Sequence, residues 1–258
     1  MGKQLARIIL ASLSLVAMPC LAQTYPATDS FSGGSSTSPV ALSSNWTNNQ
    51  NDPTDYSSTI VQAGGLATLS QNTIGMASYT GETFNNDQYA QVVVHGGKSG
   101  DNDPYGPCVR TDTNGNGYCY FPNGANGQIY ILKGGSSVSQ TNGIPGGSVL
   151  IHYQHCPYIG GLGLQAANAG DTFQISAHGS TITCTDVTTG TTDSAIDSTF
   201  SSGSPGMFIN QSYAGLPTYE LGAFQADCIP TCNTSASNPA ATPTFSPAAG
   251  TYTSPQNK

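Results

Sequence analysis

Short apolar runs at near-even spacing dominate this chain of 258 residues. From about Thr24 to Asp227 the runs are separated by Gly, Asn, Pro and Asp, which favour turns, and no helical periodicity runs through them. Many short strands with regular turn signals indicate one all-β domain, either a sandwich or a barrel. The expected strands are Thr59–Gln62, Leu66–Ser70, Tyr89–His95, Cys108–Thr111, Tyr118–Phe121, Gln128–Lys133, Ser148–His155, Thr172–Ala177, Thr181–Asp186, Gly206–Asn210 and Thr218–Gln225.

The apolar runs are of two kinds. In "DTFQISAHG" apolar and polar residues alternate, which predicts a strand with one face in the core and one face toward water. In "QVVVHG" and "SVLIHY" the apolar residues are consecutive, which is typical of strands that are covered on both faces or lie centrally between the two sheets.

The N-terminal residues have the pattern of an export signal. Lys3 and Arg7 precede an apolar stretch that is too short to span a bilayer, and Cys20-Leu21-Ala22 offers a small-residue cleavage site. We therefore predict a signal peptide over residues 1–22 and a secreted protein. A lipoprotein anchor at Cys20 is the alternative, although Pro19 occupies a position where a small residue is expected. No other stretch is long and apolar enough to predict a membrane span.

Removal of that segment leaves four basic against fourteen acidic residues, a net charge of −10. Such an acidic chain without a basic cluster repels nucleic acid and anionic lipid, so neither is an expected partner.

After Cys232 the sequence "NTSASNPAATPT" contains almost nothing apolar to bury. We expect one domain over residues 23–232, and a flexible linker with the truncated start of a second β module over 233–258.

Six cysteines remain after cleavage, and an even count in an exported protein predicts up to three disulfides. Structural zinc is the alternative, but no CxxC pair occurs. His152 and His155 would point to opposite faces of a strand, which does not suit a shared metal. The six cysteines allow fifteen pairings and are Cys108, Cys119, Cys156, Cys184, Cys228 and Cys232.

Two stretches resemble the concanavalin A-like lectin/glucanase superfamily in its laminin G-like form. The first runs from "DSFSGGSSTSPVALSSNWT" through "FNNDQYAQVVV" to "CVRTDTNGNGYCYF", and the second is "GDTFQISAHGSTITCTDVTTGTTDSAIDSTFSSGSPGMFI". The resemblance implies a two-sheet antiparallel β-sandwich, a concanavalin A-like jelly roll, that binds an extracellular glycan. The tail "PTFSPAAGTYTSPQ" resembles the opening strand of a chitobiase C-terminal-like module.

Catalytic residues are hard to find in this chain. A glycoside hydrolase needs two carboxyl groups that flank the scissile bond. Glu82 and Glu220 each lack a second acidic residue within four positions, and Asp101 and Asp103 lie in the Gly- and Pro-broken stretch "GKSGDNDPYG". No Gly-x-Ser-x-Gly elbow occurs either, so no catalytic residue is predicted.

Tyrosines are the best carbohydrate-binding candidates from the sequence. The chain has thirteen tyrosines and one tryptophan, Trp46, which we expect in the core. Tyr118, Tyr120 and Arg110 are the candidates for an exposed binding face, and the alternative is that the tyrosines only pair across strands.

The stretch "RTDTNGNGYCYF" admits two interpretations. Asp112, Asn114 and Asn116 have the spacing of a calcium loop, but its twelfth position is Asn123, which is not an acidic residue. We expect no cofactor, with weak calcium binding at this loop as the exception.

The same stretch also predicts a hairpin, for which two strand registers are possible. A two-residue turn at Asn114-Gly115 places Arg110 opposite Cys119. A four-residue loop from Asp112 to Gly115 places Cys108 opposite Cys119, and only this register permits a disulfide. We prefer the second register, which groups the two tyrosines on one face and leaves Arg110 on the disulfide face.

Three functions remain open. The first is a secreted non-catalytic carbohydrate-binding or adhesive module, and the second is an extracellular polysaccharide-active enzyme, a hydrolase or a lyase. The third is a structural surface domain without a small ligand. A pair of facing carboxylates in one groove would favour the enzyme, whereas a groove lined by Tyr, Asn and Gln would favour binding.

Overall fold

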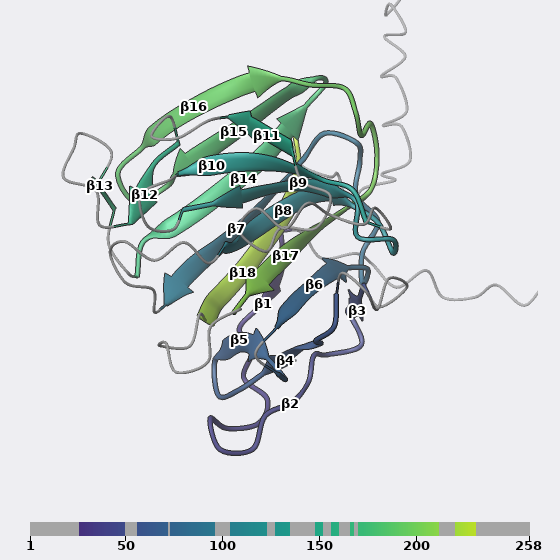
Figure 1. Ribbon diagram of the computed structural model, residues 1–258, viewed down its shortest axis with the longest axis vertical. Coiled ribbons are helices and arrows are strands. Elements are labelled where there is room, and N and C mark those ends of the chain that lie inside the picture. The colour runs from purple at the N-terminus through teal and green to yellow at the C-terminus, as the bar shows by residue number, and fades with distance from the viewer. Residues whose placement is uncertain are drawn as a thin grey trace, which may run out of the picture.

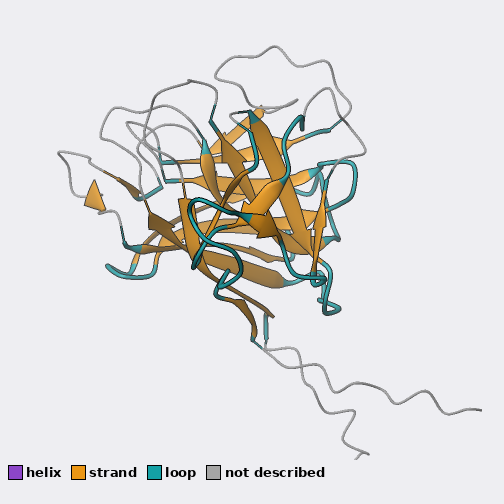
Figure 2. Cartoon of the chain, turned by 90° about the horizontal axis from the view of Figure 1, so that it is seen from below, coloured by secondary structure: helices purple, strands orange, loops and turns teal. Residues whose placement is uncertain are grey.

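The computed structural model describes residues 26–49, 56–71, 73–95, 104–122, 127–134, 148–151, 156–159, 166–167, 170–211 and 220–230. Every regular element within these ranges is a β-strand (Figure 2). The strands form two large antiparallel sheets that enclose one core, together with a small parallel pair. This arrangement confirms the expected two-sheet antiparallel β-sandwich (Figure 1).

The larger sheet has nine strands, of which β7 and β18 are central and β1 pairs only with β18. In spatial order the strands are β16 (Thr191–Ile196), β15 (Thr181–Asp186), β14 (Thr172–His178), β7 (Gln88–His95), β18 (Glu220–Cys228), β5 (Leu66–Leu69), β4 (Ile60–Gln62) and β2 (Val40–Ala41), with β1 (Ala27–Asp29) beside β18.

The smaller sheet has seven strands and lies against the first. In spatial order they are β11 (Ser148–Ile151), β10 (Gln128–Leu132), β9 (Gly117–Phe121), β8 (Tyr105–Thr111), β17 (Ser204–Asn210), β6 (Ile74–Tyr79) and β3 (Trp46–Asn48). The parallel pair consists of β12 (Tyr158–Ile159) and β13 (Ala166–Ala167).

All eleven expected strands coincide with observed ones, and except for Thr181–Asp186, which is β15, their ends differ. The expected strand Ser148–His155 is β11, which ends at Ile151, and residues 152–155 with both of their histidines lie outside the described residues. The sequence did not predict β1, β2, β3, β6, β12, β13 or β16. β16 is an edge strand whose large apolar residue, Ile196, is 71% exposed, so it has no buried apolar pattern to detect.

The main core lies between the sheets and is closed at one edge by aromatic rings. Trp46 has ring centroids at 4.6 Å from Phe224, 5.1 Å from Tyr79 and 5.9 Å from Phe31. Trp46 is 8% exposed, which confirms that it packs in the core. Edge-to-face contacts of this kind add to the free energy gained from burial itself.

A second apolar cluster covers the outer face of the seven-stranded sheet, so β8, β9 and β10 are buried along their whole length. β7, which carries "QVVV", was expected to be covered on both faces but instead alternates between buried and half-buried residues. The nine-stranded sheet therefore keeps a partly exposed outer face. The second cluster consists of Tyr56, Met76, Cys108, Cys119, Phe121, Tyr130, Leu132 and Phe208.

The predicted signal peptide (1–22) and the tail (233–258) lie outside the described residues. Over the part of the chain that is described, no helix has the length and apolar character needed to cross a membrane.

Candidate functional site

The outer face of the nine-stranded sheet is polar. In β7, β14 and β15 every second residue is buried in the core, and the residues between them are half-buried and point outward. Since the outer face of the other sheet is covered by apolar residues, this is the sheet face that polar ligands can reach. The outward residues of the three strands are Tyr89, Gln91, Val93, Thr172, Gln174, Ser176, Thr181, Thr183 and Thr185.

Strand register brings three glutamines from distant parts of the sequence together. Gln225 on β18 is opposite Gln91 on β7, and Gln91 is opposite Gln174 on β14. Each glutamine lies between two buried neighbours in its own strand, so all three point outward. We call this set the glutamine row.

An open groove of about 520 Å³ begins at the glutamine row. Its walls come from β1, the loop before β3, and the bulge of β18, where Ala223 has a left-handed φ of 35°. Bulges of this kind re-aim side chains and open space beside a strand. The described residues that line the groove are Thr28, Asp29, Ser30, Ser43, Asn45, Gln91, Val93, Thr172, Ala223, Phe224 and Gln225.

Asp29 is the only charged residue among those described lining residues, and its carboxylate is occupied by the protein itself. Oδ1 accepts from the backbone N–H of Phe31 at 2.8 Å. Oδ2 accepts from Nε1 of Trp46 at 2.8 Å and from the hydroxyl of Ser43 at 3.2 Å. Asp29 therefore fixes the groove wall to the aromatic core, and it is not a free acid or base.

Tyr89 adds an aromatic ring beside the groove. Its hydroxyl accepts a hydrogen bond from Nε2 of Gln225 at 2.7 Å. Partial burial raises the pKa of Tyr89 above its ordinary value and outweighs the lowering effect of the hydrogen bond from Gln225, and Asp227 adds a smaller rise. The phenol is therefore a neutral hydroxyl at physiological pH.

Tyr118 and Tyr120 do share one face of β9, but that face is the core and not an exposed binding surface. Both side chains are fully buried. The Tyr118 hydroxyl donates to Asp197 at 2.5 Å and accepts from the backbone N–H of Phe200 at 2.9 Å. The hydroxyl of Tyr120 donates to the carbonyl of Pro157. The alternation was right about which residues share a face, but both faces of this hairpin are covered.

Arg110 is 3% exposed and is likewise not part of a binding face. Its φ of 53° lies in the left-handed region, at a bulge between β8 and β17, and this breaks the alternation that would have placed it with the disulfide. Its guanidinium donates to three carbonyl oxygens and lies 3.5 Å from a carboxylate oxygen of Asp87. The three carbonyls, at 2.7–2.9 Å, belong to Asn86, Gly179 and Phe200.

The loop with the calcium-like spacing is a turn held by its own aspartate. Oδ1 of Asp112 accepts from the backbone N–H groups of Asn114 and Asn116 at 2.8 and 3.0 Å. Oδ2 accepts from the side-chain amide of Asn116 at 2.7 Å, and Gly115 supplies the left-handed φ of 79°. These contacts are those of an Asx turn. Weak calcium binding here stays a prediction.

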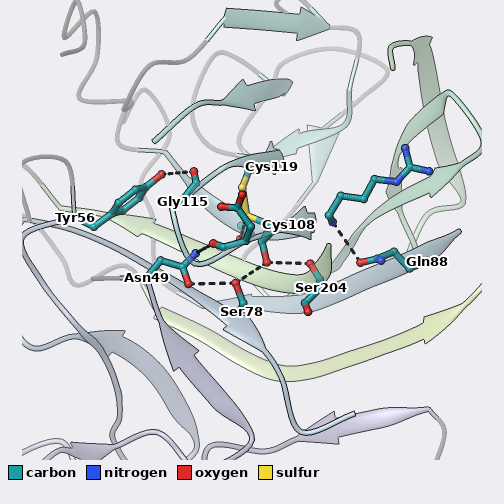
Figure 3. Close-up of a disulfide and its surroundings, with 12 residues drawn as sticks. Asn49, Tyr56, Ser78, Gln88, Cys108, Gly115, Cys119 and Ser204 are labelled. Carbon is teal, nitrogen blue, oxygen red and sulfur yellow. Dashed lines mark hydrogen bonds between the residues drawn. A yellow bond between two sulfur atoms is a disulfide. The ribbon is translucent and has the colours of Figure 1, made fainter. Parts of the chain in front are cut away.

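The hairpin has the register of the four-residue loop, with Cys108 opposite Cys119 and Val109 opposite Tyr118. Cys108 and Cys119 form a disulfide with a Cα–Cα distance of 4.1 Å. Figure 3 shows this disulfide and, near it, the Tyr56 hydroxyl, which donates to the carbonyl of Gly115 at 2.8 Å. The hairpin is thereby tied to a segment 59 residues earlier in the chain.

A second disulfide joins Cys156 to Cys184 on β15, and both residues are fully buried in the inter-sheet core. Cys228 is also disulfide-bonded, whereas Cys232 lies outside the described residues.

Among the described residues, the remaining sequence candidates do not assemble into a catalytic or metal site. Glu220 begins β18 opposite His95, and Glu82 lies in the connection before β7. Asp101 and Asp103 are outside the described ranges. Within those ranges no group of three or more His, Cys, Asp or Glu side chains could hold a metal ion.

No protein-family model matches this chain, and no curated protein matches it. Solved structures do share its fold. A carbohydrate-binding module, CBM66 from Bacillus subtilis, is 13% identical over 70% of this chain and 95% of its own, with a TM-score of 0.44. The exoplasmic/lumenal domain of VIP36, in its Ca²⁺/Man3GlcNAc-bound form, is 9% identical over 72% of this chain and 86% of its own, with a TM-score of 0.48.

A third similar structure is the CBM2 module of the evolved Dit of Lactobacillus casei BL23 phage J-1. It is 14% identical over 78% of this chain and 93% of its own, with a TM-score of 0.44. At these identities and scores the likeness concerns the sandwich fold, so the functional conclusion rests on the residues of this chain.

Proposed function

We propose that this protein is a secreted, non-catalytic glycan-binding module that holds an uncharged carbohydrate in the groove beside the glutamine row. The observation that carries the proposal is the chemistry of the lining, which combines amides and hydroxyls with small apolar surfaces. Sugar hydroxyls both donate and accept hydrogen bonds, and Gln91, Gln225 and Asn45 offer both kinds of group. Val93 and Ala223 supply apolar contact for the C–H surfaces of a sugar ring.

The electrostatics favour an uncharged ligand. The described part of the chain has two side chains with a permanent positive charge, Arg110 and Lys133, and neither lines the groove. Burial lowers the pKa of Arg110, although Tyr118 and Asp87 oppose this effect, and its donors are used by carbonyl groups and Asp87. Among the described residues of this acidic protein, the groove therefore offers a uronate, sulfate or sialate group no cation to pair with.

The same lining argues against hydrolysis in this groove. Glycoside hydrolysis needs an acid and a nucleophile or base on two carboxyl groups. Asp29 is the one carboxylate among the described lining residues, and it accepts three hydrogen bonds from the protein. We therefore propose binding without bond cleavage.

Export is supported by the chain itself. Two fully described disulfides stabilise the fold, and disulfides form and persist in oxidising compartments. Together with the predicted signal peptide over residues 1–22, they support an extracellular site of action.

The test is a glycan array screened with residues 23–258, in calcium and in a chelator, together with a reducing-sugar release assay on the polysaccharides bound. The array should carry neutral polymers such as β-glucan, xylan and mannan, and acidic ones such as pectin and alginate. Gln91→Ala is the binding variant. Gln71→Ala is its matched control, because that exposed glutamine lies in the turn between β5 and β6, outside the groove.

We expect binding to at least one neutral polymer, weaker binding for Gln91→Ala, unchanged binding for Gln71→Ala and no sugar release. Calcium should not be required, since Asp112 already uses both carboxylate oxygens in its own turn. Failure to bind any glycan would refute the proposal in favour of a structural surface domain. Release of reducing sugar would instead show an enzyme.

A further inference from the structure

The glutamine row continues across the sheet beyond the groove. Gln174 on β14 is opposite Thr185 on β15, and Thr185 is opposite Thr192 on β16. These residues also lie between inward-facing neighbours, and the hydroxyls of the two threonines are 3.2 Å apart. One line of polar side chains therefore crosses five adjacent strands, from β18 to β16.

The spacing of this line is set by strand pairing. Neighbouring strands lie about 4.8 Å apart, so five strands place polar groups at regular steps over about 19 Å. One such step is close to the length of a single sugar unit in an extended pyranoside chain. A polysaccharide that runs across the strands can therefore contact one polar side chain per sugar. Because glutamine side chains are long, they can adjust to the gradual twist of the sheet.

The amides of the row are available to a ligand. Gln91 and Gln174 are half-buried, and within the described part of the chain their side chains make no hydrogen bond to protein. Gln225 uses Nε2 to donate to Tyr89 at 2.7 Å, which leaves its Oε1 as an acceptor for a ligand hydroxyl. No residue of the row carries a charge, which favours an uncharged chain.

We propose that an extended, uncharged polysaccharide lies across β18, β7 and β14 and continues toward β16, with successive sugars above successive strands. The groove holds one part of the chain, and Gln174 contacts a sugar beyond it. This inference rests on the proposed function, because it concerns the ligand of the same surface. It specifies that this ligand is a segment of a polymer, and not a single sugar or the end of a chain.

Chain length is the property that tests the inference. Binding should be measured by calorimetry with cello-, xylo-, manno- and chito-oligosaccharides of two to six sugars and with the parent polymers. The proteins compared should be the wild type, Gln174→Ala and the control Gln71→Ala. Gln174 has no protein hydrogen bond to lose in the described part of the chain, and circular dichroism and melting temperature should verify that its variant is folded.

We expect affinity for the bound series to rise with each added sugar and to level off at about five, the number of strands crossed. Gln174→Ala should weaken binding of the longer oligosaccharides about threefold to tenfold, as the loss of one neutral hydrogen bond does. It should leave the two-sugar ligand unaffected, and Gln71→Ala should change neither.

Two results would overturn the inference while the proposed function stands. One is equal affinity for two and six sugars, and the other is a folded Gln174→Ala variant that binds long ligands like the wild type. Absence of binding to every oligosaccharide and polymer would overturn the inference and the proposed function together.

Discussion

Gln225 donates a hydrogen bond from its side-chain amide to the hydroxyl of Tyr89 over 2.7 Å, across the pairing of β18 with β7. The contact determines which way the amide of Gln225 faces, since its NH₂ group is used and its carbonyl oxygen points away. A neutral phenol thus orients one member of the glutamine row before a ligand arrives. Preorganisation of this kind reduces the ordering that binding would otherwise require.

Tyr89→Phe should therefore weaken glycan binding although it keeps the aromatic ring. The amide of Gln225 loses its partner and must be ordered by the ligand, which we expect to reduce affinity about threefold for the loss of one neutral hydrogen bond. Calorimetry with a neutral oligosaccharide is the measurement, and Gln71→Ala is the control for loss of a polar group elsewhere. Unchanged affinity would show that the orientation of Gln225 does not matter for binding.

Asp29 should be important for stability as well as for the groove. Asp29→Ala leaves the indole N–H of Trp46, which is 8% exposed, without its acceptor, and an unsatisfied buried donor costs about 1–3 kcal/mol. Urea unfolding should show a loss of that size in the free energy of unfolding. Asp29→Asn keeps one acceptor oxygen and should lose less. Equal stability of the wild type and both variants would contradict the anchoring role.

Local patterns in the sequence predicted local structure well. Nearby residues alone predict the turn from Asp112 to Gly115 and the register that pairs Cys108 with Cys119. Only a few loop lengths are possible here, and an aspartate, a glycine and two cysteines are enough to choose among them. The alternation in β14 likewise predicted which of its residues face the core. Such features need no knowledge of how distant strands pair.

The candidate site could not be found in this way. Alternation groups Tyr118 with Tyr120, but it does not say that the opposite face of the hairpin is also covered, by the cluster around Phe121. The glutamines of the row come from strands that are distant in the sequence and meet only through the pairing of β18, β7 and β14. One available signal was that Gln174 occupies a polar position of an alternating strand, although its partners depend on tertiary structure.

Arg110 should prove a structural residue. Arg110→Met would remove the guanidinium from beside the carboxylate of Asp87, which keeps His178 at 3.0 Å, and would remove the donors from three carbonyl oxygens. We expect a loss of about 3 kcal/mol in the free energy of unfolding, because removing one partner of a buried charged network leaves its other groups unsatisfied. Arg110→Lys keeps the charge but not the planar set of donors, so it should be intermediate.

Chemical denaturation of the three proteins at neutral pH measures this effect, and glycan affinity of the folded variants should remain that of the wild type. A folded Arg110→Met variant with selectively lost binding would restore Arg110 as a binding residue.

The pair of Tyr118 and Asp197 should make stability depend on pH at both extremes. Burial raises the pKa of Tyr118 to about 12, and its hydrogen bond to Asp197 adds to the rise. The resulting stability is fully present below the ordinary tyrosine value of 10.0 and is lost as the pH rises toward 12. Burial raises the pKa of Asp197, but hydrogen bonds from Tyr118 and Thr199 outweigh it and hold the pKa below the ordinary value of 3.8. That contribution is present above 3.8 and is lost as the pH falls through the lower folded value.

Tyr118→Phe removes the hydrogen bond, so the stability difference from the wild type should be largest near neutral pH. It should shrink in acid as Asp197 becomes protonated, which happens below the ordinary value of 3.8, and again above pH 10, where the wild type loses its own advantage. Urea unfolding of both proteins across this range is the measurement. Tyr120→Phe is the control for the acid range, because the Tyr120 hydroxyl donates to the carbonyl of Pro157, which does not titrate. A difference for Tyr118→Phe that stayed constant from strongly acid to strongly alkaline pH would show that the pair contributes no coupling between protonation and folding.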